Sequence, residues 1–147
     1  MHQTRVLVVY DHDIVRRGIR SLLSGDSEFD IICETSTGEE AVAKAQEHCP
    51  DIVLLDMRLP GISGLEAARS IRAVSPLSRI LFMSQYDSKE MVQEAFSAGG
   101  TGCLLKSDAG RELLSAIRAV QVGTRYVSDK IVFSGQETLS SRGRSQI

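Results

Sequence analysis

Short apolar runs alternate with amphipathic stretches along most of this chain. Mostly apolar runs at residues 5–9, 29–33, 52–55, 80–83 and 103–105, the first of them rich in β-branched residues, predict five strands. Apolar positions at helical spacing in residues 13–24, 38–48, 65–74, 88–98 and 109–122 predict five helices between and after them. Strictly alternating strands and helices predict an α/β fold with a doubly wound parallel sheet.

Polar residues directly follow four of the five expected strands. Tyr10 and Asp11 follow the first strand, Asp56 the third, Ser84 the fourth and Lys106 the fifth. Since the carboxyl ends of parallel strands meet at one edge of the sheet, and ligands bind at that edge in open α/β folds, these side chains are expected to share a site.

This set of groups suits transfer of a phosphoryl group to a carboxylate. Asp56 is the expected nucleophile, and Asp11 and Asp56 are expected to bind a Mg²⁺ ion that offsets the charge of the oxygens. Lys106 and Ser84 are expected to contact the phosphoryl group. Mg²⁺ dependence is therefore a prediction of the sequence.

Four ordered sequence blocks resemble the motif blocks of bacterial response-regulator receiver domains. They are VLVVYDHDIVRRGIRSLL, DIVLLDMRLPGISGLEAARSIR, ILFMSQYD and GGTGCLLKS. The likeness covers residues 5–127 and is closest to the NarL/LuxR-type transcription regulators. It implies a flavodoxin-like (βα)5 fold with the strand order 2-1-3-4-5.

The resemblance also implies a role for each matching residue. Asp56 matches the phosphoacceptor, Asp11 a metal ligand, Ser84 the switch hydroxyl and Lys106 the lysine that pairs with the phosphoryl group. The backbone carbonyl of Arg58 matches a third metal ligand.

Two positions depart from the family pattern. Tyr10 stands where relatives usually carry the first acid of a pair, which is expected to weaken Mg²⁺ binding. Cys103 stands where an aromatic switch residue is usual, so that any response to phosphorylation is expected to differ.

Structural roles are the alternatives for these residues. Asp56 could cap a turn, and Lys106 and Ser84 taken singly could be a solvated lysine and a turn serine. Asp11 and Asp13 could cap the first helix, a role expected mainly of Asp13. His12 is expected to be a surface or structural residue, and the thiols are expected in or near the core: Cys33, Cys49 and Cys103.

Composition narrows the class of protein. The 147 residues, 42% hydrophobic and 24% charged, fit one globular domain at residues 1–122, followed by a docking segment and linker at 123–147. A net charge of −2 gives no overall basic footprint for binding DNA. Three widely spaced cysteines and the absence of a signal peptide or spanning segment predict a cytoplasmic protein that does not enter the membrane.

The leading functional expectation is a signalling switch rather than an enzyme. It would take a phosphoryl group from a sensor histidine kinase and control a transcriptional output. The resemblance implies a possible homodimer through the face of residues 88–122, and DNA binding only through a C-terminal helix-turn-helix domain that these residues lack.

Two other functional classes remain open from the sequence. The first is a phosphorylation-independent receiver that acts as a protein-binding module, because Tyr10 replaces a metal-site acid. The second is an enzyme on a flavodoxin-like scaffold, although the sequence has neither a Gly-rich phosphate loop nor a Ser-His-Asp set.

Overall fold

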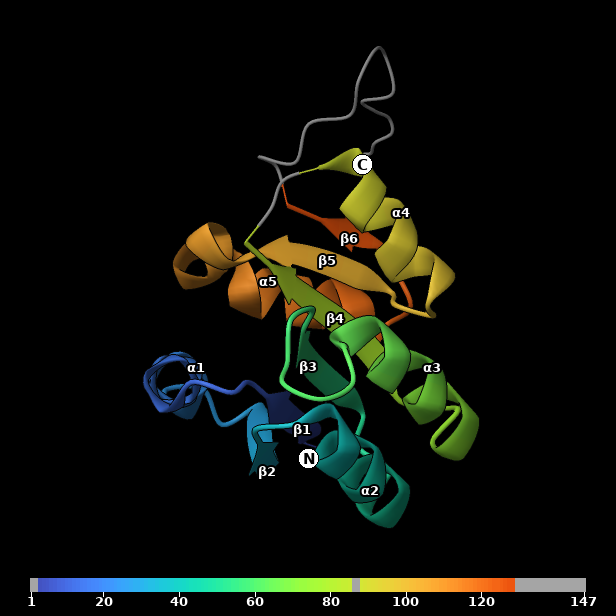
Figure 1. Cartoon of the computed structure of the whole chain (residues 1–147). Helices are drawn as coiled ribbons and strands as arrows, with labels where there is room; N and C mark the ends of the chain where they lie inside the picture. The colour runs from blue at the N-terminus through green and yellow to red at the C-terminus, as the bar shows by residue number, and fades with distance from the viewer. Residues whose placement is uncertain (1–2, 86–87, 129–147) are drawn as a thin grey trace.

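The computed structural model describes residues 3–85 and 88–128, which form a layered α/β domain (Figure 1). The strands are β1 (Thr4–Val9), β2 (Phe29–Thr35), β3 (Ile52–Asp56), β4 (Arg79–Ser84), β5 (Gly102–Leu105) and β6 (Tyr126–Val127). The α-helices are α1 (Asp13–Ser24), α2 (Gly38–His48), α3 (Gly64–Val74), α4 (Lys89–Ser97) and α5 (Ala109–Gln121), and a 3-10 turn, η1 (Lys106–Asp108), precedes α5.

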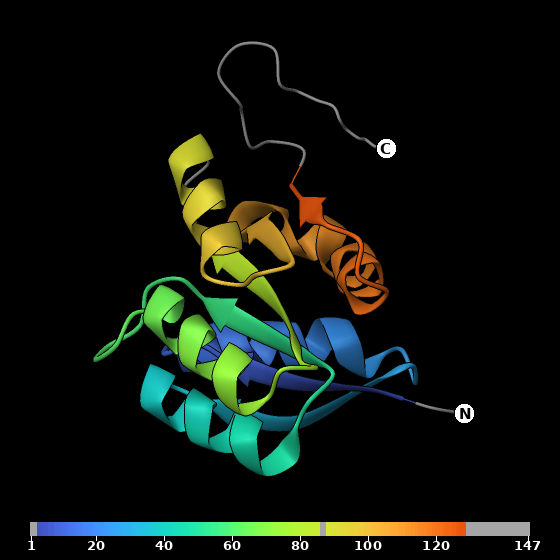
Figure 2. The ribbon, with the colours of Figure 1, turned by 90° about the vertical axis from the view of Figure 1, so that its right-hand side faces the viewer.

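The strands form one parallel sheet in the order β2-β1-β3-β4-β5-β6. The views in Figures 1 and 2 agree that helices cover both faces. One core cluster joins the sheet to α2, α3 and α4, and a second joins it to α1 and α5. The four central strands are almost wholly buried because they are covered on both faces, which explains their continuous apolar sequence.

The expected fold class and strand order are confirmed, and the sheet gains one strand. The pair Tyr126–Val127 adds β6 in parallel to β5, with Tyr126 opposite Gly102 and Val127 opposite Cys103. This short strand lies within the segment that the sequence analysis assigned to docking. The linker predicted toward a further domain lies, from residue 129 onward, outside the described residues.

Side-chain caps start three of the five described α-helices, and α1 and α5 start without one. Ser63 and Glu66 form a capping box at α3, while Thr37 caps α2 and Ser88 caps α4 through their hydroxyls. The capping role expected of Asp13 is wrong. His12 occupies the N-cap position and its side chain makes no capping hydrogen bond. The Asp13 carboxylate lies in the first turn of the helix and pairs with Arg17 at 2.9 Å.

The cysteines differ from the expected pattern at one position. All three are free thiols, with Cys103 buried and Cys33 half-buried. Cys49 is exposed, which corrects the expectation of a core thiol. It ends α2 in a left-handed conformation with φ of 46°, and this turn directs the chain away from the helix at the surface.

No helix within residues 3–85 and 88–128 is long and apolar enough to cross a membrane.

Candidate functional site

The register of the parallel strands brings the predicted site residues to one edge of the sheet. Val9 pairs with Leu55, so the residues that follow β1 lie level with Asp56 at the end of β3. Asp56 in turn pairs with Met83, the residue before Ser84. Ser84 pairs with Leu105, the residue before Lys106. The geometry expected from the strand pattern is therefore present.

Asp56 is a buried carboxylate held by its own loop. The residue is 2% exposed, and the backbone N–H of Arg58 donates to its Oδ1 atom at 3.2 Å. At the start of α3, Gly64 packs so closely that an added Cβ would lie 2.1 Å from the Asp56 carbonyl oxygen. Only glycine allows this approach, and the helix thereby fixes the backbone of Asp56.

Lys106 makes an ion pair with Asp56. It begins η1 directly after β5, and its Nζ atom lies 3.1 Å from Asp56 Oδ1. Burial raises the pKa of Asp56, and the N–H of Arg58 and the ammonium of Lys106 counteract this only in part. The charge of Asp11 contributes a further rise in the pKa of Asp56. Burial therefore affects the pKa of Asp56 more strongly than the nearby charge of Lys106 does.

Asp11 lies at the same edge but is more exposed. About a third of its side chain is accessible, and its Oδ1 atom contacts Nδ1 of His12 at 2.9 Å. Asp11 follows β1 at the edge where β3 ends in Asp56, and its charge contributes to the raised pKa of Asp56. His12 itself is largely exposed, in agreement with the surface role expected of it.

A divalent cation would have few protein ligands here. Across the part of the chain that the structure describes, no group of three or more His, Cys, Asp or Glu side chains could hold a metal ion. The donors expected from the sequence are the carboxylates of Asp11 and Asp56 and the backbone carbonyl of Arg58. They are all oxygen atoms, which fits Mg²⁺, an ion that retains several waters.

Ser84 and Cys103 are both buried beside this edge. Ser84 ends β4 and is 2% exposed. Cys103 lies in β5 within the core cluster on the α2, α3 and α4 face. Burial raises the pKa of its thiol to about 12, so that it remains protonated and unreactive at neutral pH. The structure thus buries a small, unreactive side chain at this position.

Tyr10 is the residue whose environment the sequence did not reveal. Its side chain is fully buried in the core cluster beneath α1 and α5, and its hydroxyl has no hydrogen-bond partner among the described residues. Burial, followed by the charges of Asp56 and Asp11, raises its pKa. The Lys106 ammonium lies 5.2 Å from the centre of its ring. Because Tyr10 follows an apolar strand, the sequence predicted that it lies at the edge of the sheet. The sequence did not predict that its side chain turns into the core.

Arg16 fixes the backbone at Tyr10. Its guanidinium donates to the Tyr10 carbonyl at 2.5 Å and lies 3.5 Å from a carboxylate oxygen of Glu34 in β2. This contact ties α1 to the loop that carries Asp11.

The family model described as the response regulator receiver domain matches residues 6–118. Two curated relatives are the response regulator UvrY of Escherichia coli, 38% identical over 126 residues, and the response regulator GacA of Pseudomonas viridiflava, 37% identical over 127 residues. Each alignment covers 86% of this chain, but 58% of UvrY and 59% of GacA. The chain therefore spans somewhat over half the length of these relatives.

Solved structures of response regulators are also similar to this chain. A LuxR-family two-component response regulator from an Aurantimonas species is similar with a TM-score of 0.84 at 36% identity, covering 88% of this chain and 93% of that one. The signal receiver domain of the putative response regulator NarL from Mycobacterium tuberculosis has a TM-score of 0.79 at 31% identity, covering 84% and 99% respectively. Similarity thus extends over nearly all of the described fold.

Proposed function

Because this chain belongs to the response regulator receiver domain family of two-component systems, we propose that it accepts a phosphoryl group on Asp56 from a sensor histidine kinase and thereby controls a transcriptional output. The observation that carries the proposal is the buried Asp56 carboxylate, with the Lys106 ammonium 3.1 Å from it.

The transfer is a displacement at phosphorus. A carboxylate oxygen of Asp56 attacks the phosphorus of the kinase phosphohistidine, a P–O bond forms, and the P–N bond breaks with its electron pair left on the imidazole. Lys106 is placed to contact the added negative charge, and the Ser84 hydroxyl at the neighbouring strand end is the proposed donor to a phosphoryl oxygen.

Asp11, Asp56 and the carbonyl of Arg58 are the residues that would hold Mg²⁺. The ion would supply positive charge to reduce repulsion between the carboxylate and the phosphoryl oxygens. With Tyr10 in place of a further acid, this chain offers only two carboxylates, so that we expect its affinity for the ion to be low.

The same proposal makes the chain a switch rather than an enzyme, acting in the cytoplasm. Its output would come from a DNA-binding domain outside these residues, and the face formed by α4, β5 and α5 would pair two copies. Reversing the charge of an exposed α4 residue, as in Glu94→Lys, should weaken self-association of the phosphorylated protein in analytical ultracentrifugation. Unchanged association would exclude that face.

The second candidate is a receiver that works without phosphorylation as a protein-binding module. The observation in its favour is Tyr10, whose buried ring takes the place of a metal-site acid. In this case the fold and the partner surface remain, while the metal-dependent chemistry is lost.

Intact mass spectrometry after incubation with acetyl phosphate separates the two candidates. The parent protein, Asp56→Asn and Tyr10→Asp should each be measured with and without Mg²⁺. A Mg²⁺-dependent phosphoryl adduct that is lost in Asp56→Asn supports the phosphorylated switch. No adduct in the parent protein but an adduct in Tyr10→Asp supports the phosphorylation-independent module.

A further inference from the structure

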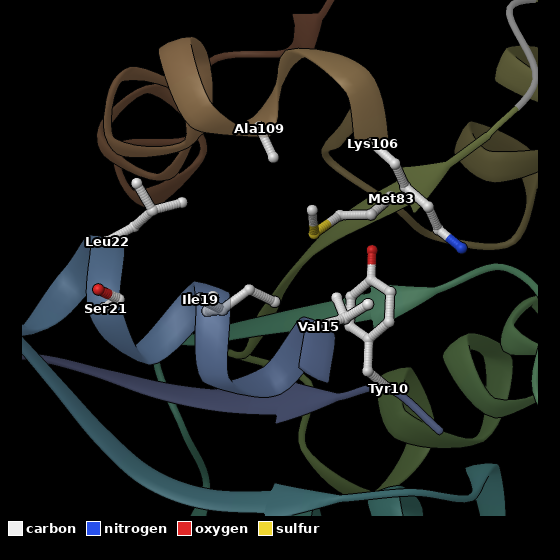
Figure 3. Close-up of a pocket in the computed structure, with 9 residues that line it drawn as sticks. Tyr10, Val15, Ile19, Ser21, Leu22, Met83, Lys106 and Ala109 are labelled. Atoms are coloured by element: carbon white, nitrogen blue, oxygen red, sulfur yellow. The ribbon is translucent and has the colours of Figure 1, made fainter. Parts of the chain in front are cut away.

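A cavity of about 500 Å³ lies between α1 and α5, behind the phosphoacceptor edge. Figure 3 shows Val15, Ile19 and Leu22 of α1 on one side, and Ala109 and Lys106 on the other. Cavities of about 300 to 1,000 Å³ accommodate small organic molecules. The volume of this open cavity falls within that range.

The cavity has an open rim and a buried inner end. At the rim, Gly18 and Ser21 are exposed, and a Cβ added at Gly18 would meet nothing within 4 Å. At the inner end lie Ile19, Met83 and Tyr10, which are all buried. A ligand would enter between the two helices and extend toward the sheet.

The inner end carries two hydrogen-bond donors. The Tyr10 hydroxyl is buried without a partner among the described residues and points toward Met83 and Lys106 (Figure 3). A buried hydroxyl without a partner is costly, so an acceptor placed there gains a hydrogen bond and relieves that cost. Met83 is unbranched and can change rotamer to admit such an acceptor. The Lys106 ammonium, which pairs with Asp56 at 3.1 Å, lies beside the same ring.

We propose that this cavity binds a small monocarboxylic acid with an apolar tail. The tail lies along Val15, Ile19 and Leu22, and the carboxylate accepts from the Tyr10 hydroxyl near the Lys106 ammonium. An uncharged molecule with a tail of the same length would fill the apolar part of the cavity but would make no ionic interaction with Lys106. The proposal concerns binding alone and does not depend on phosphorylation of Asp56.

Octanoate is a suitable probe, with 1-octanol as its uncharged counterpart. Isothermal titration calorimetry should show one saturable octanoate site, and binding of 1-octanol should be at least about tenfold weaker because a hydrogen bond to a charged group is lost. Tyr10→Phe removes only the hydroxyl and should weaken octanoate binding by about tenfold for the same reason.

Two glycine variants test the location. Gly18→Leu places a side chain at the rim and should weaken octanoate binding by obstructing entry. Gly110→Leu is the matched control, since Gly110 is also an exposed helical glycine with open space around it but does not line the cavity. Amide shifts in NMR spectra should fall on residues 15–22 and 106–109. The proposal is overturned by a lack of saturable binding, by equal binding of octanol, by unchanged binding in Tyr10→Phe, or by shifts confined to other residues.

Discussion

The Nζ atom of Lys106 lies 3.1 Å from Oδ1 of Asp56, yet the pKa of Asp56 is still raised. Burial disfavours the charged carboxylate more strongly than the hydrogen bonds from Arg58 and Lys106 favour it. Any additional positive charge near Asp56 would therefore stabilise its ionised carboxylate. This relationship leads to the first two predictions.

Removing the charge of Lys106 should raise the pKa of Asp56 further. Lys106→Gln takes away the ammonium that opposes the effect of burial. NMR titration of the Asp56 side-chain carbon should therefore show a higher midpoint in the variant than in the parent protein. Lys44→Gln is the control, because Lys44 pairs with Glu47 on α2 and should leave the Asp56 midpoint unchanged. A midpoint that is equal or lower in Lys106→Gln would refute the prediction.

Asp56→Asn should stabilise the fold at neutral pH. The pKa of Asp56 is higher in the folded than in the unfolded protein. Its contribution to folding stability is therefore complete below the unfolded-state pKa and is lost as the pH rises through the folded-state pKa. At neutral pH the parent protein therefore bears the cost of a buried charge that asparagine avoids. Thermal unfolding should give a higher Tm for Asp56→Asn at neutral pH, and the difference should narrow as the pH falls into the acid range.

Asp30→Asn provides the matched control for that comparison, since Asp30 is an exposed acid of β2. Its Tm should not rise in the same way. If Asp56→Asn unfolds at the same temperature as the parent protein at neutral pH, or at a lower one, burial does not dominate the energetics of the acceptor.

Tyr10→Phe should stabilise the protein by about 1 kcal/mol when no ligand is added, because it removes a buried hydroxyl that has no partner among the described residues. Urea unfolding measures the change. Tyr126→Phe should have the opposite effect, because the Tyr126 hydroxyl donates to Glu112. Loss of this hydrogen bond should lower the free energy of unfolding by about 1 kcal/mol. A destabilising effect of Tyr10→Phe would mean that the hydroxyl is satisfied by water.

The strand ends could be predicted from sequence because each central strand is an apolar run followed directly by a polar residue. Four such runs place Asp11, Asp56, Ser84 and Lys106 at one edge, and the register agrees. The direction of the Tyr10 side chain could not be predicted in this way. It depends on the space beneath α1 and α5, which arises only when distant helices pack.

Three other differences between the sequence predictions and the structure have tertiary or local causes. The strand β6 has two residues and becomes a strand only by pairing with β5, so that no local pattern indicates it. At α1, aspartate is a good N-cap residue, but Arg17 one turn later provides the Asp13 carboxylate with an alternative partner. At Cys49, an apolar residue type suggested burial, whereas the end of α2 determined its exposure.

Gly64→Ala should destabilise the protein by about 1 to 3 kcal/mol, the usual range for forcing extra atoms into a packed site. The new Cβ would lie 2.1 Å from the Asp56 carbonyl oxygen, and backbone rather than a flexible side chain must then move. Gly110→Ala, in open space in the first turn of α5, should instead leave the protein at least as stable as the parent protein. Urea unfolding of both variants checks the pair, and equal effects would contradict the close packing of Gly64 on Asp56.

The three cysteines should react with iodoacetamide in an order set by burial. Cys49 is exposed and should be alkylated first, with the half-buried Cys33 slower. Cys103 is buried and its thiol has a pKa of about 12, so its thiolate population at neutral pH is roughly a thousandfold below that of an ordinary cysteine. Peptide mass spectrometry over time should find Cys103 unmodified in the native protein, and all three modified at similar rates in denaturant. Alkylation of native Cys103 at the rate of Cys49 would mean that β5 opens readily, in which case Cys103 could not serve as a fixed packing residue behind Ser84.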